Sequence, residues 1–263
     1  MKEGTAISTV AVTGSASGIG AATATRLRDA GHRVIGVDLR SADVPADLAA
    51  TEGRTAAVEG VLDRCDGVLD GLVACAGLGP HVDDVARIAQ VNYFGTVAVI
   101  DGLFPALRKG TAAAAVVVSS VASTHLKWEE NPLTEAIETG DESLIAEAVA
   151  AGGDYRGQFA YAAGKNALTV AVRRRAAEWG AAGVRLNTVA PGSVDTPLLA
   201  ATAEDPRYGE AIRGFTAPIP RHGRPDEIAA LACYLLGPDA GFVHGAQFVV
   251  DGGIDALLRP TVF

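Results

Sequence analysis

Cysteine is scarce in this chain of 263 residues, which contains only Cys65, Cys75 and Cys233. The odd number of cysteines and the lack of a CxxC pair argue against a disulfide framework and against a zinc site. No cluster of His, Cys and Glu has the spacing of metal ligands, so we expect no bound metal. Free thiols suit a reducing cytoplasm, and Cys75 is more typical of a small buried residue than of a nucleophile.

Positively charged residues are also few relative to negatively charged ones. The chain has 22 Lys and Arg against 31 Asp and Glu, a net charge of −9 and a pI of about 5.0. Nucleic acids and anionic membrane surfaces bind basic faces, so we expect neither as a partner. No run of 18 apolar residues could span a membrane, and residues 1–9 lack the apolar core of a signal peptide. These absences favour a cytoplasmic protein.

Hydrophobic residues, in contrast, make up 49% of the chain, and glycine is abundant with 31 residues. This composition and length suit one well-buried α/β domain over residues 1–263. Apolar, β-rich runs alternate with helical patterns. We predict a doubly wound parallel sheet of about seven strands with helices on both faces. The predicted strands are residues 7–13, 34–37, 69–74, 114–118, 184–189 and 247–250, and the predicted main helices are residues 21–30, 51–63, 92–109, 161–180 and 225–236.

A glycine-rich turn follows the first predicted strand. Residues 14–20 read GSASGIG, and the helix and strand after them end at Asp38. Glycines let the backbone approach a pyrophosphate, and the start of a helix supplies amide donors and the positive end of its dipole. The GxxxGxG spacing differs from the commoner GxGxxG, and such a turn alone could be a plain tight turn. The strand–turn–helix–strand setting that ends in an acid favours dinucleotide binding.

Asp38 indicates which dinucleotide is bound. A carboxylate at the end of the second strand suits the diol of an adenosine ribose and repels a 2′-phosphate. The glycine turn contains no basic residue, and Arg40 lies past the acid, where it could stack on adenine. NAD is therefore expected rather than NADP. Asp47 and Leu48 precede the next predicted helix and are candidates to flank the adenine.

Tyr161 and Lys165 stand four residues apart and would share one face of a helix. A phenol has a reference pKa of about 10, which is too high for an efficient proton carrier near neutral pH. An ammonium one turn away favours the phenolate and lowers that pKa. The pair could therefore move a proton to or from an alcohol or ketone oxygen. An ordinary surface tyrosine and lysine is the alternative, because the pattern is common.

Several short motifs follow one another along the chain. They are TGSASGIG (13–20), Asp38, CAG (75–77), Asn92, Ser119-Ser120, YAAGK (161–165) and Pro191-Gly192 through Thr196. The ordered set resembles the short-chain dehydrogenase/reductase family across essentially the whole chain. The resemblance implies a Rossmann fold and a catalytic group made of Asn92, Ser120, Tyr161 and Lys165.

The same resemblance implies how these residues act and which ones hold the cofactor. Lys165 would hold the nicotinamide ribose, and Asn92 would fix a water that links Lys165 to solvent. The third-strand motif reads ACAG where the family has NNAG, so Ala74 and Cys75 receive no role from it. The implied cofactor-binding residues are Gly14, Ser17, Gly18, Ile19, Gly20, Asp38, Leu39, Arg40, Asp47, Leu48, Ala76, Gly77, Tyr161, Lys165, Pro191, Gly192, Val194 and Thr196.

Ser120 and Tyr161 stand much further apart here than in typical members of the family. The extra segment, residues 121–160, is acidic and is called the insert below. It could be a surface elaboration, a wall of the substrate cleft or a change in how subunits pack. It holds two short helical patterns, with Asp141 as a cap of the second. The patterns cover residues 133–138 and 143–150.

Two later segments bear on substrate and assembly. Residues 197–224 are rich in Pro, Gly and polar residues and are a candidate lid over an apolar substrate. The tail, residues 255–263, is apolar for a terminus and could pack on its own domain or on a partner subunit. We expect a homo-oligomer, either a dimer or a tetramer, as the family resemblance implies.

The insert and the segments CAGLGP, VNYFG, SSVAS, NALTVAVR, AAGVRLNT and HGAQFVVDGGIDALLRP resemble one branch of the family, the bacterial 3α-hydroxysteroid dehydrogenases/carbonyl reductases. This implies NAD(H)-linked interconversion of a 3α-hydroxysteroid and its 3-ketone, with carbonyl reduction of nonsteroidal ketones. One alternative is a dehydrogenase for another apolar alcohol, such as a terpenoid or an aromatic carbonyl. Another is a noncatalytic NAD-binding regulator, which would have no need of Ser120, Tyr161 and Lys165.

Overall fold

The computed structural model describes residues 8–214 and 216–262. Its strands are β1 (Thr9–Thr13), β2 (Arg33–Asp38), β3 (Val44–Pro45), β4 (Gly71–Ala74), β5 (Ala114–Val118), β6 (Arg185–Pro191) and β7 (Gln247–Val250). All pair in parallel in one seven-stranded sheet with the order β3-β2-β1-β4-β5-β6-β7, which confirms the predicted fold class. The direction of winding reverses beside β1, and ligands bind outside the carboxyl ends of the strands at such a reversal.

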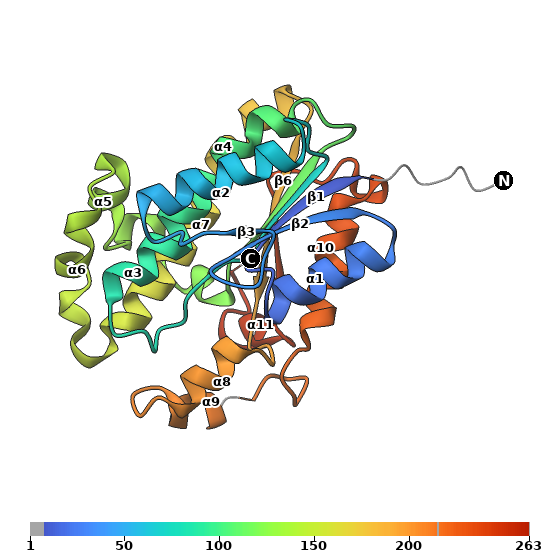
Figure 1. Ribbon diagram of the computed structural model, residues 1–263. Coiled ribbons are helices and arrows are strands. Elements are labelled where there is room, and N and C mark those ends of the chain that lie inside the picture. The colour runs from blue at the N-terminus through green and yellow to red at the C-terminus, as the bar shows by residue number, and fades with distance from the viewer. Residues whose placement is uncertain (1–7, 215, 263) are drawn as a thin grey trace.

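Helices cover both faces of the sheet. The main ones are α1 (Gly18–Asp29), α2 (Thr51–Arg64), α4 (Thr96–Leu107), α7 (Arg156–Ala181) and α10 (Pro225–Leu236). In Figure 1, α1 and α10 lie to the right of the sheet, and α2, α4 and α7 lie on the opposite side. Within residues 8–262, position 215 aside, no helix combines the length and the apolar character that a membrane span requires.

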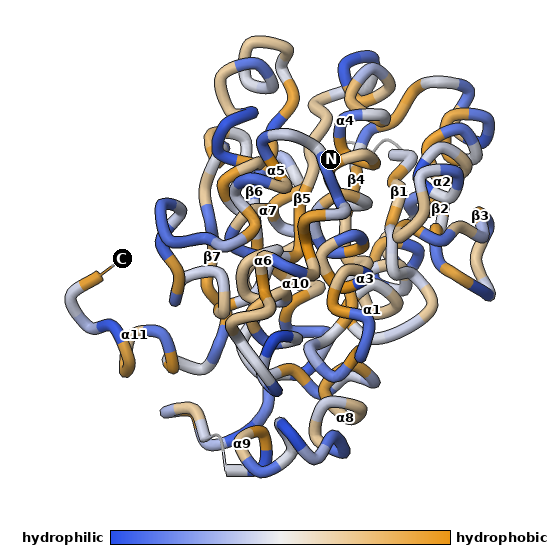
Figure 2. Tube along the Cα trace, turned by 90° about the vertical axis from the view of Figure 1, so that its left-hand side faces the viewer, coloured by the Kyte–Doolittle hydropathy of each residue, from blue (hydrophilic) through white to orange (hydrophobic). Residues whose placement is uncertain are grey.

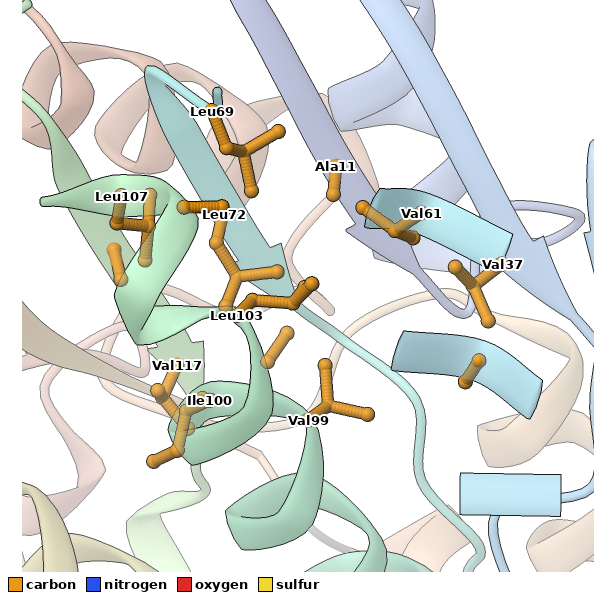
Figure 3. Packing of buried hydrophobic residues seen from close by; sticks show 14 of the residues in the cluster. Ala11, Val37, Val61, Leu69, Leu72, Val99, Ile100, Leu103, Leu107 and Val117 are labelled. Carbon is orange, nitrogen blue, oxygen red and sulfur yellow. The ribbon is translucent and has the colours of Figure 1, made fainter. Parts of the chain in front are cut away.

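Side chains of the central strands alternate between two hydrophobic cores. In β4, Leu72 packs with α2 and α4, whereas the next residue, Val73, packs with α1 and α10. In β5, Val117 belongs to the first core and Val116 to the second. Figure 3 shows the first core, where the leucines of α4 meet the strands. Because helices cover both faces of the sheet, these strands are continuous apolar runs in the sequence. Such runs are easy to recognise from the sequence alone.

Three elements differ from the predicted boundaries. The edge strand β3 has two residues, too few to produce a pattern. The helix predicted to open at Asn92 begins earlier, with α3 (Val85–Ala89) capped by Asp84, and passes through a π-helical turn, η1 (Gln90–Gly95), into α4. α7 begins five residues before Tyr161, so the end of the insert is part of this helix. Ile7, in the first predicted strand, lies outside the described residues.

The insert forms a small helical layer against α3 and α7. Its helices α5 (Thr134–Thr139) and α6 (Ile145–Ala148) match the two predicted patterns. Asp141 caps the 3₁₀ turn that leads into α6 by accepting from Ser143 N at 3.0 Å. Leu133 and Ile145 are fully buried among apolar residues of α3 and α7. The 3₁₀ turns around them are η2 (Val121–His125), η3 (Trp128–Glu130), η4 (Glu142–Leu144) and η5 (Ala150–Tyr155).

The candidate lid contains two helices, α8 (Pro197–Glu204) and α9 (Gly209–Gly214), which lie below the sheet in Figure 1. A 3₁₀ turn, η6 (Pro238–Ala240), follows α10. The tail carries α11 (Ile254–Leu258), which projects beside the β7 edge in Figure 2. Ile254 is buried, whereas Leu257, Leu258 and Val262 are exposed. The start of α11 therefore packs on the rest of the chain, whereas these three apolar side chains face outward.

Candidate active site

A cleft of about 480 Å³ opens at the carboxyl ends of the strands. Every residue predicted to bind cofactor lines it except Arg40, whose side chain is exposed outside the cleft. Ser120, Tyr161 and Lys165 line the same cleft. Asn92 does not, because it lies buried behind the cleft wall. The structure thus brings together nearly all of the predicted site and leaves out Arg40, which stands two residues beyond the end of β2.

The glycine turn fits closely between β4 and α1. Gly14 has a φ of +68° and Gly18 a φ of +52°, values that residues other than glycine rarely adopt. A Cβ on Gly14 would lie 2.9 Å from Ala76 N, and a Cβ on Gly20 would lie 2.1 Å from Gly14 O. In the GxxxGxG spacing, Gly18 therefore permits the turn and Gly14 its close approach to the residues after β4. Gly20 permits the start of α1 to pack against the turn.

Asp38 closes this part of the cleft at the end of β2. Its carboxylate accepts hydrogen bonds from Ala16 N at 3.0 Å and from Leu39 N at 2.7 Å. The carboxylate therefore stands beside the glycine turn, on the opposite side of β1 from β5. The contact of this carboxylate with an adenosine ribose stays a prediction.

Asp47 and Leu48 lie at the same end of the cleft, in the loop after β3. Burial raises the pKa of Asp47, but the Ala49 amide and the Arg87 guanidinium, 2.7 Å away, together hold it below its ordinary value. Arg87 also lines the cleft. The sequence reasoning missed Arg87, because the helix that carries it, α3, was not predicted.

The residues predicted to transfer the proton meet where β5 ends against α7. Ser120 ends the strand region and caps η2, its Oγ accepting from Ala122 N at 3.2 Å. Burial raises the pKa of Tyr161, while the neighbouring Ser120 hydroxyl lowers it. Lys165 is 4% exposed, donates from Nζ to Val118 O at 2.9 Å, and has a pKa lowered by burial to about 8. The net direction of the pKa shift for Tyr161 is upward, because burial outweighs the hydrogen bond with Ser120, and the lowering by Lys165 stays a prediction.

Asn92 lies in the π-helical turn, a distortion that is frequent at functional sites. Its Oδ1 accepts from Leu78 N at 2.7 Å, and its Nδ2 donates to Leu78 O at 2.9 Å. A Cβ on Gly77 would lie 3.1 Å from Asn92 Oδ1 and 3.4 Å from Lys165 Nζ. Asn92 thus fixes the loop after β4 and stands close to Lys165 on the other side of Gly77, where a Cβ would make tight contacts.

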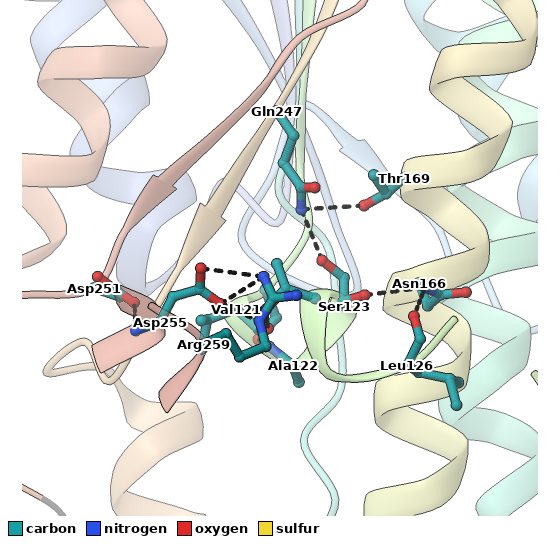
Figure 4. Close-up of polar contacts among 12 residues, drawn as sticks. Val121, Ala122, Ser123, Leu126, Asn166, Thr169, Gln247, Asp251, Asp255 and Arg259 are labelled. Atoms are coloured by element: carbon teal, nitrogen blue, oxygen red, sulfur yellow. Dashed lines mark hydrogen bonds and ion pairs between the residues drawn. The ribbon is translucent and has the colours of Figure 1, made fainter. Parts of the chain in front are cut away.

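Hydrogen bonds from α7 and β7 hold η2, and with it Ser120, in place (Figure 4). Asn166 Nδ2 donates to Ser123 O at 3.0 Å and to Leu126 O at 2.7 Å. Gln247 Nε2 donates to Ser123 Oγ at 2.7 Å. Sequence reasoning missed Asn166 and Gln247, because their partners lie far away along the chain.

Beyond the serine and tyrosine, the cleft wall is mainly apolar. The candidate lid contributes residues of α8 and α9, and the insert contributes only its two ends. Across the opening, His81 Nδ1 lies 2.9 Å from Thr202 Oγ1, and Arg207 Nη2 donates to His81 O at 2.9 Å. The lid is thereby joined to the loop after β4. The wall residues are Leu78, Pro80, Val121, Ala122, His125, Gln158, Leu198, Leu199, Thr202, Ile212 and Ile254.

Comparison with known proteins gives matches over nearly the whole chain. The sequence model described as short chain dehydrogenase matches residues 8–132, and the one described as Enoyl-(Acyl carrier protein) reductase matches residues 136–255. The 3-alpha-hydroxysteroid dehydrogenase/carbonyl reductase of Comamonas testosteroni is 52% identical over 98% of this chain and 100% of that protein. The cis-4-hydroxycyclohexanecarboxylate dehydrogenase of Sinomonas cyclohexanicum is 33% identical over 94% of this chain and 96% of that protein.

Among solved structures, the 3-alpha-hydroxysteroid dehydrogenase from Pseudomonas sp. B-0831, complexed with NADH, superposes with a TM-score of 0.93. It is 50% identical, and the match covers 97% of this chain and 100% of that one. Similarity of this extent, in sequence and in fold, shows that the chain belongs to the short-chain dehydrogenase/reductase family.

Proposed function

We propose that this protein is an NAD(H)-dependent oxidoreductase that interconverts 3α-hydroxysteroids and 3-ketosteroids and also reduces nonsteroidal ketones. The observation that carries the reaction type is that Ser120, Tyr161 and Lys165 line the same cleft as the glycine turn. The choice of substrate is supported by the apolar wall of that cleft and by the 52% identical relative, which is named for this activity.

The residues of the cleft fit NAD at its two ends. Gly14 and Gly18 leave the backbone of the turn open to a pyrophosphate, and the carboxylate of Asp38 suits a ribose diol and opposes a 2′-phosphate. Val194 and Thr196 line the same cleft, with the Thr196 side chain beside Gly18, and would hold the carboxamide. When bound, the nicotinamide accepts a hydride from the alcohol carbon or returns one to the ketone.

The chain's own residues handle the proton. Tyr161 takes the hydroxyl proton during oxidation and returns it during reduction. Ser120 donates a hydrogen bond to the reacting oxygen and stabilises its developing charge. The ammonium of Lys165 holds the cofactor ribose and favours the phenolate as charge forms on Tyr161. Asn92, beside Lys165 at Gly77, would hold a water that carries the proton to solvent.

The same proposal covers organisation and setting. One domain over residues 1–263 is supported by a single sheet that takes strands from both halves of the chain, with the lid at 197–224 and the insert at 121–160. A homo-oligomer, dimer or tetramer, is supported by the exposed leucines of α11. A cytoplasmic setting is supported by Cys65, Cys75 and Cys233, all of which are free.

The test measures NADH formation at alkaline pH with androsterone, its 3β epimer, and a panel of cyclic, terpenoid and aromatic alcohols, with NAD and NADP in parallel. We expect strong NAD-linked turnover of androsterone and none of the 3β epimer. Turnover of the nonsteroidal alcohols alone would keep the mechanism and reject the steroid. NAD binding without turnover of any alcohol would favour the regulator.

A further inference from the structure

Arg54 is a buried charged residue with no part in proton or hydride transfer. It lies near the start of α2, is 8% exposed, and packs 5.9 Å from the centre of the Phe94 ring. A guanidinium cannot lose its charge in a protein, so a buried one requires acceptors for its five N–H groups and an opposite charge.

Three separate parts of the chain supply those acceptors. Nε donates to Leu48 O and Nη2 to Ala49 O, both at 2.9 Å, in the loop after β3, residues 47–50. Nη2 also approaches Gln90 O, the first residue of the π-helical turn, at 3.4 Å. Glu142, in η4 of the insert, pairs with both Nη1 and Nη2, the second contact at 3.0 Å. The insert therefore provides the countercharge for a residue that orients the 47–50 loop.

This loop forms one end of the cleft. Asp47 and Leu48 line it, and β3, which precedes the loop, lies at the edge of the sheet furthest from β7. The peptide groups that Arg54 holds are those that connect Leu48 to α2. A shift of these peptides would move the cleft wall beside Asp38 without touching Ser120 or Tyr161.

We propose that Arg54 and Glu142 are a positioning pair through which the insert sets the affinity of the protein for the adenosine half of its dinucleotide. The inference rests on the proposed NAD site. It gives the insert a part in cofactor binding, although its helices α5 and α6 do not line the cleft. Neither residue touches the reacting atoms.

The experiment measures the Kd of NAD and of AMP by titration calorimetry, and the KM for NAD and kcat with androsterone, for Arg54→Met and Glu142→Gln. We expect the Kd of both ligands and the KM for NAD to rise about tenfold, the size of one lost buried charge-assisted hydrogen bond. We expect kcat at saturating NAD to change less than about twofold. Glu142→Gln in the Arg54→Met background should add little, because the two residues act as a pair.

Arg174 and Glu138 provide a matched control. They also join the insert to another helix, at 2.7 Å, but their side chains are 51% and 50% exposed and lie away from the cleft. Arg174→Met and Glu138→Gln should leave both Kd values unchanged. If Arg54→Met does not fold, Glu142→Gln, which keeps the shape of the side chain, still decides the matter.

Folded variants with wild-type Kd values would overturn the inference, and so would a loss confined to kcat. The proposed function fails separately, if the wild-type protein does not bind NAD. The inference depends only on the ratio of variant to wild-type affinity, for AMP as well as for NAD.

Discussion

Tyr161 and Lys165 share one turn of α7, and burial acts on their pKa values in opposite directions. It raises the pKa of the phenol and lowers that of the ammonium to about 8, so both charged forms are disfavoured. The residue types and spacing predicted the pair, but not the net direction of the tyrosine shift, because burial depends on the whole fold. The hydrogen bond from Ser120 is the contact that opposes the effect of burial on Tyr161.

Replacing Tyr161 with phenylalanine removes one hydroxyl from the site. We expect kcat to fall by about a thousandfold, within the usual range for loss of a general acid or base, and the Kd of NAD to stay within about twofold of the wild-type value. Stopped-flow kinetics and calorimetry measure the two quantities. Tyr234→Phe, at an exposed site on α10, is the control. Near-normal turnover of Tyr161→Phe would remove it from the mechanism.

Asp38→Ala tests the choice between NAD and NADP. The change removes the carboxylate that repels a 2′-phosphate and frees two backbone amides, Ala16 N and Leu39 N. We expect the KM for NAD to rise about tenfold and the preference for NAD over NADP to shrink by at least about tenfold. Parallel rates with both cofactors measure this preference, with Asp63→Ala on α2 as control. An unchanged preference would show that Asp38 lies outside the cofactor contacts.

The lowered pKa of Lys165 predicts that the stability of the protein depends on pH. Its pKa is about 8 in the folded protein and 10.5 in the unfolded reference, so the unfolded chain binds more protons between these values. The contribution of Lys165 to the free energy of unfolding therefore rises as pH increases from about 8 to 10.5, and is constant below about 8. Urea denaturation of the wild type and of Lys165→Met across this range isolates the effect. A difference between the two that falls or stays flat contradicts the lowered pKa.

At the level of elements, the strands next to the site could be predicted from the sequence. The long-range contacts that position the loops and helices around the site could not. The glycine turn and YAAGK sit within local patterns, so sequence placed them. The π-helical turn around Asn92, and Arg87 on α3, depend on a helix that starts earlier than its apolar pattern suggests. The pair of Arg54 and Glu142 joins residues 88 positions apart, a distance at which a single sequence gives no signal.

Asn166→Ala tests how the catalytic helix holds η2. The variant loses the donors to Ser123 O and Leu126 O, so the turn that Ser120 caps becomes less fixed against α7. We expect kcat to fall about tenfold, as for a displaced catalytic group, while the Kd of NAD is retained. Asn166→Asp, which keeps the shape but replaces the amide donor with a carboxylate, should not restore kcat. Wild-type kcat in Asn166→Ala would mean that η2 is held without it.

For the molecule as a whole, sequence reasoning gave the fold class, because continuous apolar strands between amphipathic helices have few other arrangements. It gave the two helices of the insert but not their packing against the rest of the chain, and it gave neither helix of the candidate lid, because short helices depend on tertiary packing rather than on local propensity. Leu133 and Ile145 show this, since their burial requires both α3 and α7.

The two hydrophobic cores, one on each face of the sheet, predict which residues contribute most to the free energy of unfolding. Leu72 is fully buried in a central strand, and Leu72→Ala should lower the free energy of unfolding by about 3 kcal/mol, from lost transfer energy and the cavity left behind. Leu257, 62% exposed on α11, should change it by less than about 0.5 kcal/mol on the same substitution. Chemical denaturation measures both. Equal losses would mean that α11 belongs to the cooperative core.

The parallel sheet also determines on which side of the molecule, relative to the cleft, a fused linker or reporter would begin. Since every strand points its carboxyl end at the cleft, the chain enters β1 on the opposite side of the molecule. α11, in contrast, begins at Ile254 in the cleft wall and is tied by Asp255 to Thr124 Oγ1 at 2.7 Å. A linker or reporter joined at the start of β1 would therefore begin on the side of the sheet away from the cleft, whereas one joined after α11 would follow a helix that begins in the cleft wall.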